Sequence, residues 1–161
     1  MKRPGSTFEI SVATADALRT IGELVSTHLF SGAVVLLDGP LAAGKTTFVQ
    51  GVARGLGVRG VVTSPTYAIL HEYPEATIPL RHADLYRIES AGEWASLALD
   101  ERVGIDGAWL IEWASRFPEA WPAERLEIRI EIHGDARLAY FAAFGLRHVR
   151  LLALLAGASK S

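Results

Sequence analysis

The chain has 161 residues, and its 16 basic and 18 acidic side chains give a formal net charge of −2. This length fits one domain over residues 1–161, and the ordinary content of charged and hydrophobic residues argues against a disordered chain. The near balance of charge gives no reason to expect nucleic-acid binding by the chain alone. The lack of cysteine excludes disulfides, thiolate metal sites and thiol nucleophiles.

The two ends of the chain predict neither a membrane span nor a secretion signal. Residues 138–158 form the longest apolar stretch, but Arg147, His148 and Arg150 interrupt it, so it falls short of a span. The start, Met-Lys-Arg-Pro-Gly, has basic residues without a following apolar run. We therefore expect a cytoplasmic protein with no membrane contact.

The first part of the chain predicts a strand, loop and helix unit. Residues 7–11 alternate weakly and predict a short edge strand, after which a helix capped by Thr14 would run to about residue 30. Residues 33–38 form a continuous apolar run, which is typical of a strand buried on both faces of a parallel sheet. A glycine-containing turn follows, and residues 45–56 return to helical spacing.

The second part predicts further strands and an antiparallel hairpin. Segments with strand character are residues 68–73, 80–84 and 108–113, and segments with helical character are 91–99 and 146–156. Residues 125–133 alternate strictly, which predicts a strand with one wet face, and the Gly134-Asp135 turn would fold it back onto residues 137–144. We expect an α/β fold with a mainly parallel sheet and a C-terminal antiparallel hairpin.

One motif carries a definite chemistry. Residues 39–46 read Gly-Pro-Leu-Ala-Ala-Gly-Lys-Thr and match the phosphate-binding loop pattern G-x-x-x-x-G-K-[ST]. The loop would leave a buried strand and open a helix, where free amides and the helix dipole meet polyphosphate. The motif predicts the three-layer sandwich of P-loop NTPases, with these loop residues around the phosphates: Pro40, Leu41, Ala42, Ala43 and Gly44.

Charge and reach suggest roles for the side chains that follow the loop. Lys45 would contact the β- and γ-phosphates, Thr46 would give its hydroxyl to Mg²⁺, and Thr47 would reach the α-phosphate. The alternative is a glycine-rich turn with a solvated lysine. Unchanged nucleotide affinity after Lys45→Ala would favour that alternative.

A magnesium triphosphate site also needs carboxylates at the ends of neighbouring strands. Asp84 and Glu112 each end a predicted strand, so both would lie beside the loop if those strands run parallel to the first. Glu112 is the better candidate to position an attacking water, because the only glutamine, Gln50, lies in the helix after the loop. The alternative is an ordinary surface ion pair for each acid. Thr66 could sense the γ-phosphate through Mg²⁺, or belong to a simple Ser-Pro turn.

Two absences predict which nucleotide is bound. Without asparagine the chain cannot contain the Asn-Lys-x-Asp motif that reads guanine, and no Asp-x-x-Gly switch element occurs. ATP is therefore the expected nucleotide.

Four segments together resemble one bacterial family. They are the loop at 39–47, Ser-Pro-Thr-Tyr at 64–67, His-Ala-Asp-Leu-Tyr-Arg at 82–87 and Ile-Glu-Trp at 111–113. In this order and spacing, and over nearly the whole chain, they are similar to the TsaE family, small ATPases of tRNA threonylcarbamoyladenosine biosynthesis.

The resemblance implies a magnesium-dependent ATPase, slow alone, that joins a threonylcarbamoyl transferase and its non-catalytic paralogue and supports repeated turnover of the transferase. The chain would meet tRNA only through that complex. The family positions that carry over are Lys45 and the loop amides for phosphate, Thr46 and Glu112 for Mg²⁺, Asp84 as a second acid, Thr14 near the adenine and Trp113 beside the nucleotide. Trp113 could equally be a core aromatic residue.

The loop departs from the family pattern at two positions. Most members have an acidic residue and a further glycine where this chain has Pro40 and Ala42. Proline stiffens the loop and alanine restricts the backbone angles that glycine would allow, so we expect loop geometry or nucleotide affinity to differ.

Two other functions stay open on the sequence alone. A small-molecule or nucleoside kinase uses the same loop but needs an acceptor pocket and an arginine-bearing lid. No long arginine-rich insertion occurs, although four arginines could line a cleft: Arg81, Arg87, Arg102 and Arg116. A non-enzymatic assembly module would bind ATP without hydrolysing it.

Overall fold

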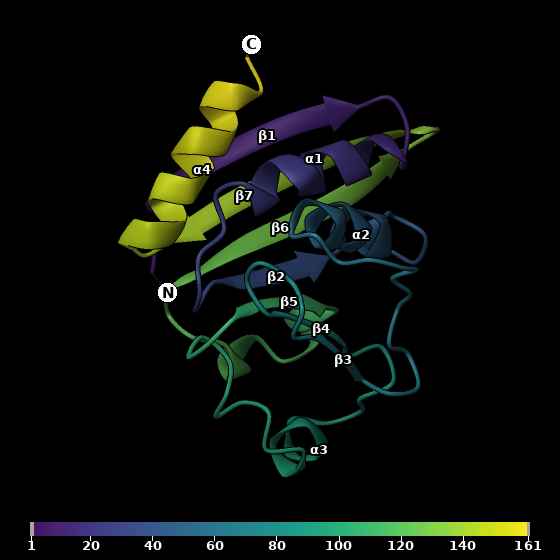
Figure 1. Ribbon diagram of the computed structural model, residues 1–161, viewed down its shortest axis with the longest axis vertical. Coiled ribbons are helices and arrows are strands. Elements are labelled where there is room, and N and C mark those ends of the chain that lie inside the picture. Colours follow the sequence, from purple (N-terminus) through teal and green to yellow (C-terminus); the bar gives the residue numbers. More distant parts are fainter. Residues whose placement is uncertain (1, 161) are drawn as a thin grey trace.

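The computed structural model describes residues 2–160 as a mixed sheet of seven strands with helices packed against it (Figure 1). The strands are β1 (Ser6–Val12), β2 (Val34–Asp38), β3 (Leu70–Tyr73), β4 (Leu80–Asp84), β5 (Ala108–Glu112), β6 (Arg125–His133) and β7 (Ala136–Phe144). The helices are α1 (Ala17–Ser26), α2 (Lys45–Gly55), α3 (Ala91–Ser96) and α4 (Leu146–Ala158), with 3₁₀ helices η1 (Ala114–Arg116) and η2 (Pro118–Ala120).

The strand order is β1-β7-β6-β2-β5-β4-β3. The four central strands, β6, β2, β5 and β4, run parallel to one another, while β7 and β1 on one side and β3 on the other are antiparallel to their neighbours. The predicted α/β fold with a C-terminal antiparallel hairpin is confirmed. The carboxyl ends of β2, β5 and β4 therefore meet at one edge of the sheet, where Asp84 is in register with Glu112.

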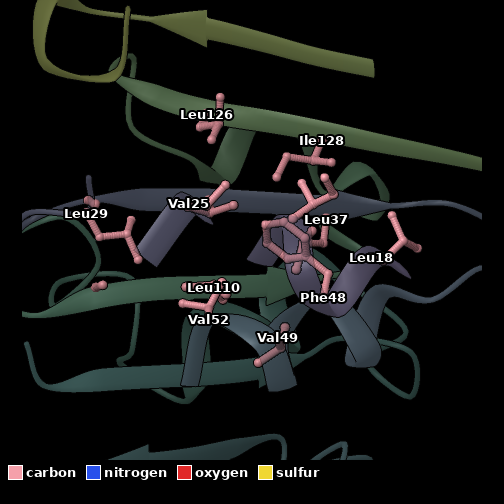
Figure 2. Close-up of a cluster of buried hydrophobic side chains, with 14 of the residues drawn as sticks. Leu18, Val25, Leu29, Leu37, Phe48, Val49, Val52, Leu110, Leu126 and Ile128 are labelled. Atoms are coloured by element: carbon pink, nitrogen blue, oxygen red, sulfur yellow. The ribbon is translucent and has the colours of Figure 1, made fainter. Parts of the chain in front are cut away.

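Helices α1, α2 and α4 cover one face of the sheet (Figure 1). Figure 2 shows the centre of this layer, where α1 and α2 direct apolar side chains onto the sheet; the labelled residues are Leu18, Val25, Leu29, Leu37, Phe48, Val49, Val52, Leu110, Leu126 and Ile128. Burying a side chain of this size stabilises the fold by about 1.5–3 kcal/mol. This layer fixes where α2 begins, and so where the phosphate loop ends.

Helices α1 and α2 approach each other closely because two glycines leave room for the facing backbone. A Cβ at Gly51 would lie 2.0 Å from the carbonyl oxygen of Arg19, and a Cβ at Gly22 would lie 2.2 Å from that of Phe48. Any side chain at either position would push the helices apart.

The opposite face of the sheet is covered only in part. Apolar side chains from α3, η1 and their loops, with Trp94 and Phe117 among them, pack on β2, β5 and β4, where Trp109 of β5 joins the cluster. Over β6, β7 and β1 no second helical layer lies among the described residues, and a groove of about 780 Å³ is lined there by side chains that include Glu127 and Tyr140. The predicted wet face of residues 125–133 is confirmed, and the sandwich has three layers over half of its sheet.

Several predicted element boundaries differ from the structure; helix α3, for example, ends at Ser96 rather than at residue 99. Helix α1 is shorter than the predicted helix to residue 30; its N-cap residue is Asp16, although the Thr14 hydroxyl accepts a hydrogen bond from the Ala17 amide at 3.3 Å. Strand β3 begins at Leu70 rather than residue 68, because Ile69 has φ +67° and interrupts the extended backbone. No helix among residues 2–160 is long and apolar enough to cross a membrane.

Candidate phosphate and metal site

The phosphate loop connects the end of β2 to the start of α2. Gly44, the N-cap residue of α2, has φ +111°, and a Cβ there would lie 2.5 Å from the Leu18 side chain. Gly39 has φ +148°, and a Cβ there would lie 2.5 Å from the carbonyl oxygen of Ile130. The two glycines of the motif are thus required by backbone conformation and by space.

Ala42 lies in the left-handed region with φ +64°. This conformation costs an alanine about 1–2 kcal/mol, whereas glycine adopts it freely. The expected restriction at this position therefore takes the form of a strained residue within the loop.

Lys45 is 5% exposed. Its Nζ donates to the carbonyl oxygens of Gly39 at 2.7 Å and Pro40 at 2.9 Å, and lies 4.0 Å from the ring centroid of Trp113. Burial lowers the pKa of Lys45, and the nearby carboxyl groups of the site oppose this shift. The ammonium group is held at the mouth of the loop by carbonyl oxygens that a phosphate oxygen can replace.

Glu112 is 3% exposed at the end of β5. Its Oε1 accepts from the Thr46 hydroxyl at 2.8 Å and lies 2.9 Å from Nε2 of the fully buried His82. These contacts join the first turn of α2 to the ends of β4 and β5. The other carboxylate oxygen, Oε2, takes part in neither contact.

Asp84 is 4% exposed at the end of β4. Its Oδ1 accepts from the Tyr86 amide at 2.9 Å, and its Oδ2 accepts from the Ser64 hydroxyl, which lies 3.2 Å from the Thr66 hydroxyl. Since both acids are buried at the loop, the alternative of ordinary surface ion pairs is wrong for Asp84 and Glu112.

These groups surround one cavity of about 480 Å³. It is lined by Ala15, Leu41, Ala42, Ala43, Gly44, Lys45, Thr46, Thr47, Ser64, Thr66, Asp84, Tyr86, Glu112 and Trp113. Nearly all of the predicted site residues are therefore brought together. Pro40 does not line the cavity, but its carbonyl oxygen accepts from Lys45. Thr14 does not line it either, although its neighbour Ala15 does.

Trp113 borders the cavity and also packs, half-buried, against the apolar cluster on the second face of the sheet. It has φ +61° directly after Glu112, and its ring lies 5.1 Å from that of Tyr86. Left-handed residues other than glycine cluster at functional sites, where the surrounding structure holds them.

Some members of the site were not predicted from the sequence. Ser64, His82 and Tyr86 fall within the segments that resemble the TsaE family, but their contacts depend on which strands become neighbours. Arg137, from the far end of the chain, donates to carbonyl oxygens of the phosphate loop. No local pattern marks it.

The oxygen donors fit a magnesium ion that arrives with a phosphate ligand. Among residues 2–160 no group of three or more His, Asp or Glu side chains could hold a metal ion by itself. Mg²⁺ is commonly bound by one or two carboxylates together with substrate phosphates and water. Glu112, Asp84 and the Thr46 hydroxyl provide such a partial set.

Comparison with known proteins shows the family of this chain. The family model described as "Threonylcarbamoyl adenosine biosynthesis protein TsaE" matches residues 12–139. The chain belongs to the TsaE family. The TsaE protein of Bacillus subtilis (strain 168) is 42% identical over 134 residues, covering 83% of this chain and 84% of the relative. That of Nostoc sp. is 42% identical over 114 residues, covering 68% and 70%.

A solved structure shows the same fold. The crystal structure of Bacillus subtilis YdiB matches with a TM-score of 0.82 and 33% identity, covering 96% of this chain and 97% of that chain. The resemblance to the TsaE family drawn from the sequence motifs is therefore confirmed, and with it the assignment to a family of threonylcarbamoyl adenosine biosynthesis proteins.

Proposed function

We propose that this TsaE family member binds ATP with Mg²⁺ and hydrolyses it slowly as a component of the tRNA threonylcarbamoyladenosine modification complex. The observation that carries the proposal is the convergence of a phosphate loop, a buried lysine and two buried carboxylates on one cavity. Site architecture of this kind suits phosphoryl transfer, in which positioning and charge stabilisation do most of the work.

Each side chain has a proposed task. The loop amides and the N-terminus of α2 would bind the phosphates, and Lys45 would exchange its two carbonyl partners for β- and γ-phosphate oxygens. Thr46 and Glu112 would hold Mg²⁺, with Asp84 as the second acid. Mg²⁺, when bound, would neutralise charge on the β- and γ-phosphates.

The attacking water needs an acceptor close to the γ-phosphate. Glu112 and Asp84 are in register at the ends of adjacent strands, and Thr66 lies on the same wall beside Ser64. Glu112 remains our candidate to position that water, and Thr66 our candidate to sense the γ-phosphate. Trp113 would border the nucleotide, and Thr14 would approach the adenine.

The surroundings of the cavity support action within a complex. Leu41 lines the cavity yet is 68% exposed, and Tyr67 is 83% exposed. Large apolar side chains left in solvent beside a site are often covered by a partner. The proposed partners are the threonylcarbamoyl transferase and its non-catalytic paralogue, with tRNA met through them in the cytoplasm.

The kinase alternative gains no support from the four arginines that could line a cleft. Arg81 and Arg102 both pair with Glu72 on the adjacent strand. Arg116 donates to backbone carbonyls at Leu85 and Tyr86, and Arg87 lies over the Tyr67 ring at 3.9 Å. None of the four lines the cavity.

The proposal is tested by ATP binding and phosphate release with the purified chain, alone and with the two partner proteins. We expect Mg²⁺-dependent ATP binding, slow hydrolysis alone and a higher rate with the partners. Lys45→Ala should weaken ATP binding by about a hundredfold, because it removes charge-assisted bonds to phosphate. Lys160→Ala, at an exposed lysine, is the matched control.

Four results would contradict parts of the proposal. Unchanged ATP affinity in Lys45→Ala would show that the loop is not the phosphate site. Equal rates of ATP hydrolysis with and without the partners would show that hydrolysis does not depend on the complex. Transfer of the γ-phosphate to a metabolite would favour a kinase, and tight binding with no phosphate release in the complex would favour an assembly module.

A further inference from the structure

Arg137 joins the tip of the β6–β7 hairpin to the phosphate loop. Its Nε donates to the carbonyl oxygen of Ala43 at 3.0 Å, and one terminal nitrogen lies 3.4 Å from that of Ala42. The other terminal nitrogen donates to three carbonyl oxygens of the hairpin turn, those of Gly134, Asp135 and Ala136, at 3.1, 3.0 and 2.9 Å. One guanidinium group therefore fixes the loop against a rigid turn.

The contacts to the loop determine how a peptide plane is oriented. In a trans peptide the C=O and the following N–H point to opposite sides. A bond that holds the Ala43 carbonyl toward Arg137 therefore turns the Gly44 N–H away from Arg137. Ala43 and Gly44 both line the cavity, so this orientation suits an amide that donates to phosphate.

Arg137 also contacts the strained residue of the loop, Ala42. Ala42 has φ +64°. The backbone N–H of the next residue, Ala43, donates to the carbonyl oxygen of Pro40 at 3.1 Å, and this bond closes a turn that contains Ala42. One terminal nitrogen of the Arg137 guanidinium contacts the carbonyl oxygen of Ala42 in this turn. Arginine suits this place because its planar fork of donors reaches several carbonyls at once, whereas a lysine ammonium offers a single point charge.

We propose that Arg137 is a positioning residue for the phosphate loop: it holds the carbonyls of Ala42 and Ala43 so that Ala42 keeps its left-handed conformation and the Gly44 amide faces the phosphates. This inference rests on the proposed binding of ATP. Arg137 does not line the cavity, so it acts through the loop backbone rather than on the nucleotide.

A double-mutant comparison tests this role. Arg137→Ala should weaken binding of both ATP and ADP by about tenfold, the loss expected for charged hydrogen bonds. Glycine adopts positive φ without help, so in an Ala42→Gly background the same Arg137→Ala change should cost at most about threefold. Arg137→Lys should bind as weakly as Arg137→Ala, since it lacks the fork.

The matched control is Arg129→Ala on neighbouring β6, whose side chain is 62% exposed and lies over the Tyr140 ring. It removes an arginine of the same sheet without touching the loop, and nucleotide affinity should stay within twofold of the unmodified chain. Thermal unfolding of every variant shows whether the fold is kept. If Arg137→Ala does not fold, Arg137→Gln retains a planar donor and takes its place.

Amide hydrogen exchange over residues 39–47 gives a second measurement that needs no nucleotide. We expect faster exchange there in Arg137→Ala, and in Arg129→Ala rates like those of the unmodified chain. Unchanged exchange and affinity in Arg137→Ala would overturn the inference, as would an equal tenfold loss in both backgrounds. If the unmodified chain binds no ATP, the proposed function fails, and the exchange rates still decide whether Arg137 orders the loop.

Discussion

The two ends of strand β2 bury ionisable groups in opposite ways. At the amino end, His148 of α4 is 2% exposed, its Nε2 accepts from the Val34 amide at 3.2 Å, and its ring lies 5.0 Å from that of Phe30. Burial, with Arg147 nearby, lowers the pKa of His148 to about 4, so the side chain is neutral at pH 7. At the carboxyl end, a lysine and two acids are buried together around the phosphate loop.

The amino end of β2 is built for stability, whereas the carboxyl end is built for a function. At the amino end, a neutral imidazole accepts from the Val34 amide and packs against Phe30, although its Nδ1 has no hydrogen-bond partner among the described residues. At the carboxyl end, desolvated charged groups and the left-handed residues Ala42 and Trp113 are all held in place, although each reduces stability. Such a concentration of unfavourable features is understandable where a charged ligand binds.

The largest expected effect concerns pH at the amino end. Between pH 6.5 and 4 the unfolded chain protonates His148 and the folded chain does not, so stability falls as the pH falls through this window. The loss approaches about 3 kcal/mol near pH 4. Urea unfolding at pH 7.5 and 4.5 should show this loss, and His148→Gln should remove most of it.

Other groups also titrate in this range, so the matched control is His133→Gln at an exposed histidine. It should keep the pH dependence of the unmodified chain. The same pH dependence in His148→Gln would mean that His148 is not the group responsible.

A smaller effect on stability is expected when the positive charge of Lys45, at the carboxyl end of β2, is removed. Because burial lowers the pKa of Lys45, its charged form is less favourable in the folded chain than in the unfolded chain. Lys45→Met keeps the apolar stem, and its free energy of unfolding should be equal to or higher than that of the unmodified chain. Added ATP should raise the unfolding midpoint of the unmodified chain but not that of Lys45→Met.

Chemical denaturation of both proteins, with Lys160→Met as the exposed control, provides the measurement. A clear loss of stability in Lys45→Met would show that this lysine supports the fold. The two ends of β2 would then differ less than we infer.

The smallest effect compares two neighbouring alanines of the loop. Ala42→Gly relieves a left-handed conformation but adds freedom to the unfolded chain, so the free energy of unfolding should be unchanged or higher by up to about 1 kcal/mol. Ala43 is fully buried and has no such strain, so Ala43→Gly should lower it by about 1 kcal/mol. Equal losses in urea unfolding would contradict strain at Ala42.

The sequence predicted those parts of the site that depend on local rules. Residues 39–46 revealed the loop because Gly39 and Gly44 are needed by its backbone, and Asp84 and Glu112 could be placed because parallel strands end at a common edge. The start of α1 was predicted too early, at Thr14: its hydroxyl does accept from the amide of Ala17, the first residue of the helix, but the N-cap residue is Asp16.

Other contacts could not be predicted because they join distant segments. His82 reaches Glu112 only because β4 and β5 are neighbours, and its Nδ1 has no hydrogen-bond partner among the described residues. The same holds for Arg137, which is 94 positions from Ala43 in the chain. For the uncovered half of the sheet, the alternation in β6 predicted the wet face but could not predict which elements lie above it.

The pairing of β1 with β7 sets an order on the folding of the chain. β2, α1 and α2 can pack early, since they are close in sequence, whereas Val12 pairs with Arg137 and Ser6 with Ala143. Contacts of such long sequence separation form slowly. A nascent chain synthesised only through β5 would therefore carry the whole phosphate motif and both acids, yet lack Arg137 behind its loop. The loop would acquire its contacts with Arg137 late, when the hairpin arrives.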